Sequence, residues 1–273
     1  MILRKLAKIC LWAGALCVPA LVYGYDKNAV PDDMSDADIV FLGEQHDNPH
    51  HHTTQAAYVA GLSPSVLVFE MLTPEQASRI TPALLRDQDA LKEALEWEAS
   101  GWPDFSMYYP IFAAAHSAIV KGAGVPRQAL RDIVGSDLVT AAGQDMARRF
   151  GLDQPLPADQ QAVREALQRE SHCNALPEEL LPGMVNVQRF RDAMLAQEAL
   201  DGFEMSGGPV VVITGNGHAR LDWGAPFLVQ LAAPDVRVFA LGQGEDGSVP
   251  AGGFTHVEDT PSVDRGDPCD AFR

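Results

Sequence analysis

The sequence predicts an α/β fold, a doubly wound and mainly parallel sheet with a helical insertion between its early and late strands. Two observations predict it. Four short segments are continuously rather than alternately apolar, which is typical of strands that helices cover on both faces. Helical patterns separate them and gather in the middle of the chain, with strands at both ends. The strand segments are 38–42, 66–69, 209–214 and 236–241.

The elements follow one another in a simple order. The first strand is stopped by Gly43 and the second is closed by Glu70. Most helical segments then fall in the insertion, near residues 75–205, before the third and fourth strands. From residue 242 onward, glycine and proline predict a loop and a tail. The expected helices are 52–61, 74–97, 110–121, 136–150, 157–170, 177–203 and 226–232.

Composition narrows the class of protein. The chain has 273 residues, of which 47% are hydrophobic and 21% charged. This is a globular composition, which excludes a disordered, collagen-like or polytopic membrane protein. The formal net charge of -17 repels phosphate backbones, so nucleic acid is not expected as a partner. We expect residues 25–273 to form a single domain.

Residues 1–24 have the pattern of an export signal. A basic start with Arg4, Lys5 and Lys8 precedes an uncharged segment, residues 9–22. That segment is shorter than the roughly 20 apolar residues that cross a bilayer. We therefore expect a periplasmic or outer-membrane-associated protein. The residues before Cys17 are a poor match to the small-residue context of a lipidated cysteine, which argues against a lipid anchor.

Two cysteines, Cys173 and Cys269, remain after removal of this signal. In an oxidising compartment they either pair, which would tie the tail to the middle of the chain, or stay as two separate thiols. The sequence leaves both alternatives open because it does not give the distance between the two residues.

Four chemically active residues follow three of the predicted strands. Glu44 and His46 come after the first strand, Glu70 after the second and His218 after the third. The ligand crevice of an open α/β sheet lies outside the carboxyl ends of its strands, so we expect these side chains to converge. Imidazole and carboxylate groups together suit a divalent metal ion, or a general base with an orienting acid.

Each of these residues also has a purely structural interpretation. A glutamate after a strand commonly caps a helix or joins a salt bridge, and His218 could anchor a loop. The run from His50 to His52 could be a solvated helix start. The motif Gly-x-x-His follows both the first and the third strand, and its occurrence at two equivalent positions favours a functional site.

Several motifs in order resemble one known family. The sequence is similar to ChaN-like haem-binding uptake proteins, which share a superfamily with Tiki/TraB-type metalloproteases and erythromycin-esterase-like proteins. The resemblance extends from about residue 38 to residue 241. The motifs are Gly43-Glu-Gln-His-Asp-Asn-Pro with the histidines after it, Phe69-Glu-Met, Gly101-Trp, Tyr108-Tyr-Pro-Ile-Phe, His172-Cys, Arg191-Asp-Ala-Met and Gly215-Asn-Gly-His-Ala-Arg.

The resemblance implies an exported haem-binding protein involved in haem or iron uptake. It implies that a tyrosine, assisted by histidine, holds ferric haem at a homodimer interface, and that an outer-membrane haem receptor is a partner. Phenolate is a hard ligand suited to ferric iron. For Tyr108 and Tyr109, the structural alternative is an aromatic pair at the start of the helix at Pro110. The candidate haem-binding residues are Tyr108, Tyr109, Tyr58, His50, His51 and His52.

A metal-dependent hydrolase, peptidase-like or esterase-like, is the alternative function. Glu44, His46, Glu70 and His218 would hold a divalent metal ion or activate a water. The sequence has no His-Glu-x-x-His helix and no Gly-x-Ser-x-Gly motif, so the non-enzymatic function is favoured. It also lacks Cys-x-x-Cys-His, which excludes covalent c-type haem.

Removal of residues 1–24 is directly measurable. The mature protein should begin at Tyr25, because signal peptidase cleaves after a short apolar segment that ends in small residues. Intact-mass analysis of protein isolated from the periplasm checks this. Retention of Met1 in that material would show that the segment is an anchor or part of the domain.

Overall fold

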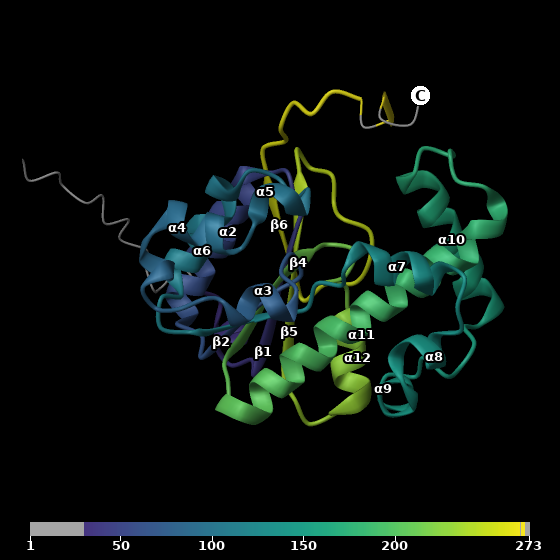
Figure 1. Ribbon diagram of the computed structural model, residues 1–273, viewed down its shortest axis with the longest axis horizontal. Coiled ribbons are helices and arrows are strands. Elements are labelled where there is room, and N and C mark those ends of the chain that lie inside the picture. Colours follow the sequence, from purple (N-terminus) through teal and green to yellow (C-terminus); the bar gives the residue numbers. More distant parts are fainter. Residues whose placement is uncertain (1–29, 268, 271–273) are drawn as a thin grey trace, which may run out of the picture.

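The computed structural model of the protein describes residues 30–267, 269 and 270, so the predicted export signal lies outside the described residues. Within that part of the chain, six strands form one parallel sheet with helices on both faces (Figure 1). The predicted α/β fold is confirmed. In spatial order the strands are β3 (Ile119–Gly122), β2 (Val66–Phe69), β4 (Val210–Gly215), β1 (Ile39–Glu44), β5 (Val238–Glu245) and β6 (His256–Thr260).

The sheet separates two hydrophobic cores. Successive side chains of a strand point to opposite faces, so Val40 and Leu42 of β1 pack into one core while Ile39 and Phe41 pack into the other. All four are fully buried. This double burial explains why the strand sequences are continuously apolar rather than alternating.

One core lies beneath the helices that come early in the chain, which gather around α2 and α6. The N-cap of α2 is Asn48, whose side chain accepts a hydrogen bond from the backbone N–H of His50. The elements on this side are α1 (Asp32–Ser35), α2 (Pro49–Leu62), α3 (Pro74–Ser78), the short 3₁₀ helix η2 (Leu84–Arg86), α4 (Gln88–Ala94), α5 (Trp97–Ser100) and α6 (Phe105–Ala114).

The other core lies beneath the long helix α11, which crosses the sheet (Figure 1). None of the helices in the described residues has the length and apolar character needed to cross a membrane. The elements on this side are α7 (Arg127–Val134), α8 (Leu138–Ala142), α9 (Gln144–Arg149), α10 (Ala158–Ser171), the 3₁₀ helix η3 (Glu178–Leu180), α11 (Leu181–Ser206) and α12 (Ala225–Ala232).

The predicted insertion and tail are not as expected. The insertion contains strand β3, which pairs with β2, and the helix expected at 74–97 is split into α3, η2, α4 and α5. Helix α6 begins at Phe105 rather than Pro110, because the side chain of Asp104 accepts a hydrogen bond from the backbone N–H of Ser106. The expected tail includes the end of β5 and all of β6.

The two cysteines form a disulfide. Cys173 follows α10, and Cys269 belongs to the C-terminal segment that runs toward α10 in Figure 1. Their Cα atoms are 5.6 Å apart, within the usual range for a bridge. Of the two alternatives that the sequence leaves open, the structure shows the disulfide.

Loss of this disulfide should destabilise the fold. It joins residues 96 positions apart, and removing a native bridge that closes so long a loop typically costs about 2–5 kcal/mol. The double variant Cys173→Ser, Cys269→Ser should therefore unfold at lower urea concentration than the oxidised protein. Identical unfolding midpoints for the two would contradict this expectation.

Candidate functional site

The four residues that follow the predicted strands converge at the carboxyl edge of the sheet. His46 Nδ1 lies 2.7 Å from Glu44 Oε1, and His46 Nε2 lies 3.7 Å from Glu70 Oε1. His218 Nε2 lies 3.7 Å from the same Glu70 oxygen. The cluster lies at the ends of β1 and β4, which are neighbours in the sheet. The chain continues from β1 to β2 on one side and from β4 to β5 on the other, so this is the switch point where α/β proteins bind ligands.

The two Gly-x-x-His motifs bring these strand ends together. A Cβ on Gly43 would lie 2.5 Å from Asn216 Oδ1, and a Cβ on Gly215 would lie 3.0 Å from His46 Nε2. Glycine therefore permits each strand end to approach the residues of the other motif. After Gly215 the chain turns back, and the N–H of His218 donates to the carbonyl of Gly215 at 2.9 Å.

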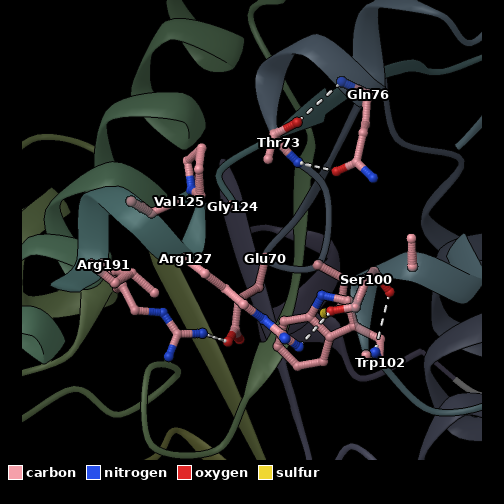
Figure 2. A pocket seen from close by; sticks show the side chains of 14 residues that line it. Glu70, Thr73, Gln76, Ser100, Trp102, Gly124, Val125, Arg127 and Arg191 are labelled. Atoms are coloured by element: carbon pink, nitrogen blue, oxygen red, sulfur yellow. Dashed lines mark hydrogen bonds and ion pairs between the residues drawn. The ribbon is translucent and has the colours of Figure 1, made fainter. Parts of the chain in front are cut away.

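Glu70 is the central carboxylate of the cluster. It pairs with Arg191 of α11, and it accepts hydrogen bonds from Thr214 Oγ1 at 2.5 Å and from the N–H of Gly215 at 2.8 Å. Figure 2 shows the Arg191 guanidinium directed at this carboxylate. Burial alone would raise the pKa of Glu70, but His218, Arg191 and His46 together lower it to about 2. Glu70 is therefore ionised.

Glu44 is a second buried carboxylate, held by three side chains. The Tyr108 hydroxyl donates to Glu44 Oε1 at 2.8 Å, beside the contact from His46, and His52 Nε2 lies 3.4 Å from Glu44 Oε2. Burial opposes ionisation, yet the hydrogen bond with His46 and the nearby imidazole of His52 hold the pKa of Glu44 well below its usual range. Glu44 thus links α2 and α6 to the end of β1.

Each imidazole at the centre of the cluster lies between two carboxylates. His46 lies between Glu44 and Glu70, which raise its pKa although burial alone would lower it. His218 lies between Glu70 and Asp192, whose Oδ1 is 2.6 Å from His218 Nδ1. Burial raises the pKa of Asp192 despite the neighbouring imidazole. Such alternating acids and imidazoles can hold and pass protons.

The three consecutive histidines have different environments. His50 is exposed at the start of α2. His51 is buried, accepts a hydrogen bond from the N–H of Gln45 at 2.8 Å, and contacts the Gly244 carbonyl at 3.2 Å. His52 is buried against the Tyr108 ring, with ring centroids 4.2 Å apart. Within this run, only His50 is exposed to solvent.

Burial also separates the candidate tyrosines. Tyr108 is fully buried, and burial together with the negative charge of Glu44 raises its pKa far above the ordinary value. The Tyr58 hydroxyl is bonded to Glu258. Tyr109 is half-buried, and its hydroxyl makes no hydrogen bond within the described part of the chain. Of these three tyrosines, Tyr109 has the hydroxyl that is free to meet a ligand.

A pocket of about 400 Å³ adjoins the cluster (Figure 2). Glu70, Arg191, Trp102 and Arg127 are among the residues that line it. The Trp102 ring lies 4.8 Å from the imidazole of His46, measured between centroids, so the pocket reaches the cluster. Side chains of both charges and an indole ring give this pocket the polar and apolar surfaces of a small-molecule site.

The metal-site prediction is not supported. Among residues 30–267, 269 and 270, no group of three or more histidine, cysteine, aspartate or glutamate side chains is arranged to hold a metal ion. The expected ligands Glu44, His46, Glu70 and His218 instead contact one another in pairs. A metal-dependent hydrolase therefore gains no support from the arrangement.

Sequence reasoning did not assign roles to three side chains of the site. Asp192 completes the cluster, Arg191 neutralises Glu70, and Trp102 packs on His46. Asp192 was detectable in principle, because it interrupts the apolar stripe of α11 that continues through Ala196 and Ala199. Arg191 and Trp102 occur in the motifs that carry the family resemblance, without a role attached to them.

The fold and this cluster define a class of protein: a parallel α/β domain whose paired Gly-x-x-His motifs face a ligand crevice. The chain belongs to the family described as haem-binding uptake, Tiki superfamily, ChaN, which matches residues 30–229. A search of curated proteins found no match.

One solved structure shares the fold, and others have lower similarity. One, described as cofacial haem binding to ChaN of Campylobacter jejuni, has 19% identity and a TM-score of 0.62, covering 82% of this chain and 88% of its own. The type III effector HopBA1 has 15% identity and a TM-score of 0.44, covering 84% and 90%. An erythromycin esterase, EreC, has 13% identity and a TM-score of 0.38, covering 78% and 71%.

Glu70 should be essential for stability, in a pH-dependent way. Glu70→Gln removes the charge of the buried carboxylate that pairs with Arg191. The free energy of unfolding at pH 7 should therefore fall by about 3 kcal/mol. The pKa of Glu70 is about 2 in the folded protein, against an ordinary 4.5. Its contribution is complete above pH 4.5 and is lost as the pH falls toward 2.

Urea unfolding of wild type and variant between pH 7 and pH 3 measures this effect. The difference in stability should narrow below pH 4.5. Glu75→Gln is the matched control, because the Glu75 side chain is 80% exposed and pairs with Arg79 on the surface. An equal difference at pH 7 and pH 3 would contradict the role given to the Glu70 charge.

Proposed function

We propose that the protein binds ferric haem outside the cytoplasm and serves in haem or iron uptake. The observation that supports this proposal is family membership, since the haem-binding uptake family matches residues 30–229. The related Campylobacter jejuni protein is described with cofacial haem. Ferric haem would supply an iron that accepts a phenolate ligand, as in proteins that use tyrosine.

Tyr109 is the haem ligand that we propose. Its hydroxyl oxygen can bind iron, because it makes no hydrogen bond within the described residues and the side chain is only partly buried. Tyr108 and Tyr58 instead donate to Glu44 and Glu258. Burial raises the pKa of Tyr109, and the negative charge of Asp87 raises it further. The unliganded side chain is therefore neutral at pH 7. The positive charge of ferric iron offsets this barrier to ionisation.

A homodimer would complete the site. Haem has two large faces, and sandwiching it between two copies removes both from water. His50 is exposed at the start of α2, so it is the member of the histidine run that a second copy could present to the haem. We propose that His50 assists in this way, while His51 and His52 stabilise the fold.

Export is part of the proposal. Residues 1–24 have the pattern of a cleaved signal, and the Cys173–Cys269 bridge is the kind of crosslink that forms in oxidising compartments. We propose a periplasmic or outer-membrane-associated protein that receives haem from an outer-membrane receptor.

Two single variants test the ligand assignment. Tyr109→Phe should remove the charge-transfer band that phenolate ligation gives to ferric haem, because the iron loses its oxygen ligand. Tyr108→Phe should keep the band and lower the unfolding free energy by about 1–3 kcal/mol, because the buried carboxylate of Glu44 loses a donor. Haemin titration followed by visible spectroscopy, together with urea unfolding, measures both effects.

The wild-type titration also tests the function itself. No haem spectrum in the wild-type protein would refute haem binding. A haem spectrum without a phenolate band would refute tyrosine ligation alone, and loss of the band in Tyr108→Phe but not in Tyr109→Phe would exchange the roles of the two residues.

A further inference from the structure

A second pocket, separate from the one beside Trp102, opens between the ends of β1 and β4 and the helix α10. Its volume is about 460 Å³. One face of α10 lines it with Arg164, Leu167, Gln168 and Ser171, which recur at the spacing of a single helix face. The rest of the wall comes from the strand ends, from α11, from the segment that carries Arg220 and Trp223, and from residues 250 and 251.

The charge of this pocket is opposite to that of the protein. The chain carries a formal net charge of -17, yet two arginines, Arg164 and Arg220, line the pocket, and none of the described residues that line it is an aspartate or glutamate. Arg220 is already neutralised, because Asp222 accepts two hydrogen bonds from it at 2.5 and 2.6 Å. Arg164, in contrast, makes no ion pair with any carboxylate of the described residues.

Arg164 is a buried cation that has no ion-pair partner in the part of the chain that the structure describes. Arg164 is only 8% exposed, and its Nε has no hydrogen-bond partner among the described residues. No described carboxylate lies within ion-pair distance of it. Asp192 and Asp222 act on it through space only, because Asp192 is bonded to His218 and Asp222 to Arg220. Burial accordingly lowers the pKa of Arg164 to about 10.

The ring of Trp223 does not offset the free energy that it costs to bury the charge of Arg164. The Arg164 guanidinium carbon is 4.9 Å from the centroid of the Trp223 ring, while the corresponding carbon of Arg220 is at 3.6 Å. Trp223 therefore already stacks on a closer cation, and a cation–π contact compensates for only a small part of the cost of burying a charge. A buried guanidinium with free N–H groups is suited to an oxyanion, which it can bind through two parallel hydrogen bonds.

We propose that this pocket binds an organic anion whose carboxylate pairs with Arg164. Amide side chains complete the recognition surface, since Gln168 and Gln188 line the pocket and offer donors and acceptors to the rest of the ligand. Gln188 also lies 3.1 Å from His218 Nδ1, so an occupied pocket would contact the acid–imidazole cluster. This inference does not require haem binding. A propionate of a porphyrin and a small free acid present the same carboxylate.

Two pairs of probes distinguish the sources of the carboxylate. Protoporphyrin IX is compared with its dimethyl ester by fluorescence titration, and succinate is compared with succinamide by thermal unfolding. The carboxylate member of at least one pair should bind more tightly than its neutral partner. Arg164→Met should weaken that binding at least about thirtyfold, as expected when one side of a buried ion pair is removed. Arg169→Met is the control, with the same charge change at a surface guanidinium paired with Glu178.

The ligand-free variants give an independent measurement. Arg164→Met should unfold at a higher temperature than wild type, because it replaces an uncompensated buried charge with an apolar side chain of similar length. Arg164→Lys, which keeps the charge, should stay folded and retain part of the carboxylate preference. A lower unfolding temperature for Arg164→Met would overturn the proposal, and so would the absence of any carboxylate preference in the wild-type protein. Neither result would bear on the phenolate band of the haem complex.

Discussion

The carboxylate of Glu70 is the interaction on which the site depends, because it connects separate parts of the chain. It follows β2, pairs with Arg191 of α11, and accepts hydrogen bonds from Thr214 and Gly215 of β4. A charge removed from water in this way is stable only when its partners are all in place. The end of β2, the helix α11 and the end of β4 are therefore held to one another through this one carboxylate.

Adjacent residues of one helix take unrelated roles because consecutive side chains point about 100° apart around the helix axis. Tyr108 faces the sheet and holds Glu44, whereas Tyr109 turns toward the surface. The same rotation places His52 against Tyr108 and leaves His50 exposed. A motif of adjacent aromatic or basic residues thus combines a structural member with one that is available to a ligand.

The sequence predicts the interior of the sheet well and its edges poorly. The central strands are continuously apolar, whereas β3 and β6 are edge strands that carry polar residues such as Lys121 and Glu258, so their composition does not distinguish them from loops. The site follows the same division. Residues directly after strands could be placed by the crevice rule. Asp192 could be recognised only as a polar residue in an apolar stripe, and Arg164 could not be placed, since periodicity does not show which turn of a helix faces the strand ends.

The position of β1 also determines when the chain can fold. Ile39 pairs with Val210 on one side and with Val238 on the other, so the central strand has no neighbour in the sheet until most of the chain has been synthesised. Folding must wait for these distant partners, and until then both edges of β1 are open to pairing with other chains. A fragment that ends before β5 would retain the family motifs but would leave one edge of β1 unpaired. Expression of such fragments should therefore yield aggregates rather than a smaller domain.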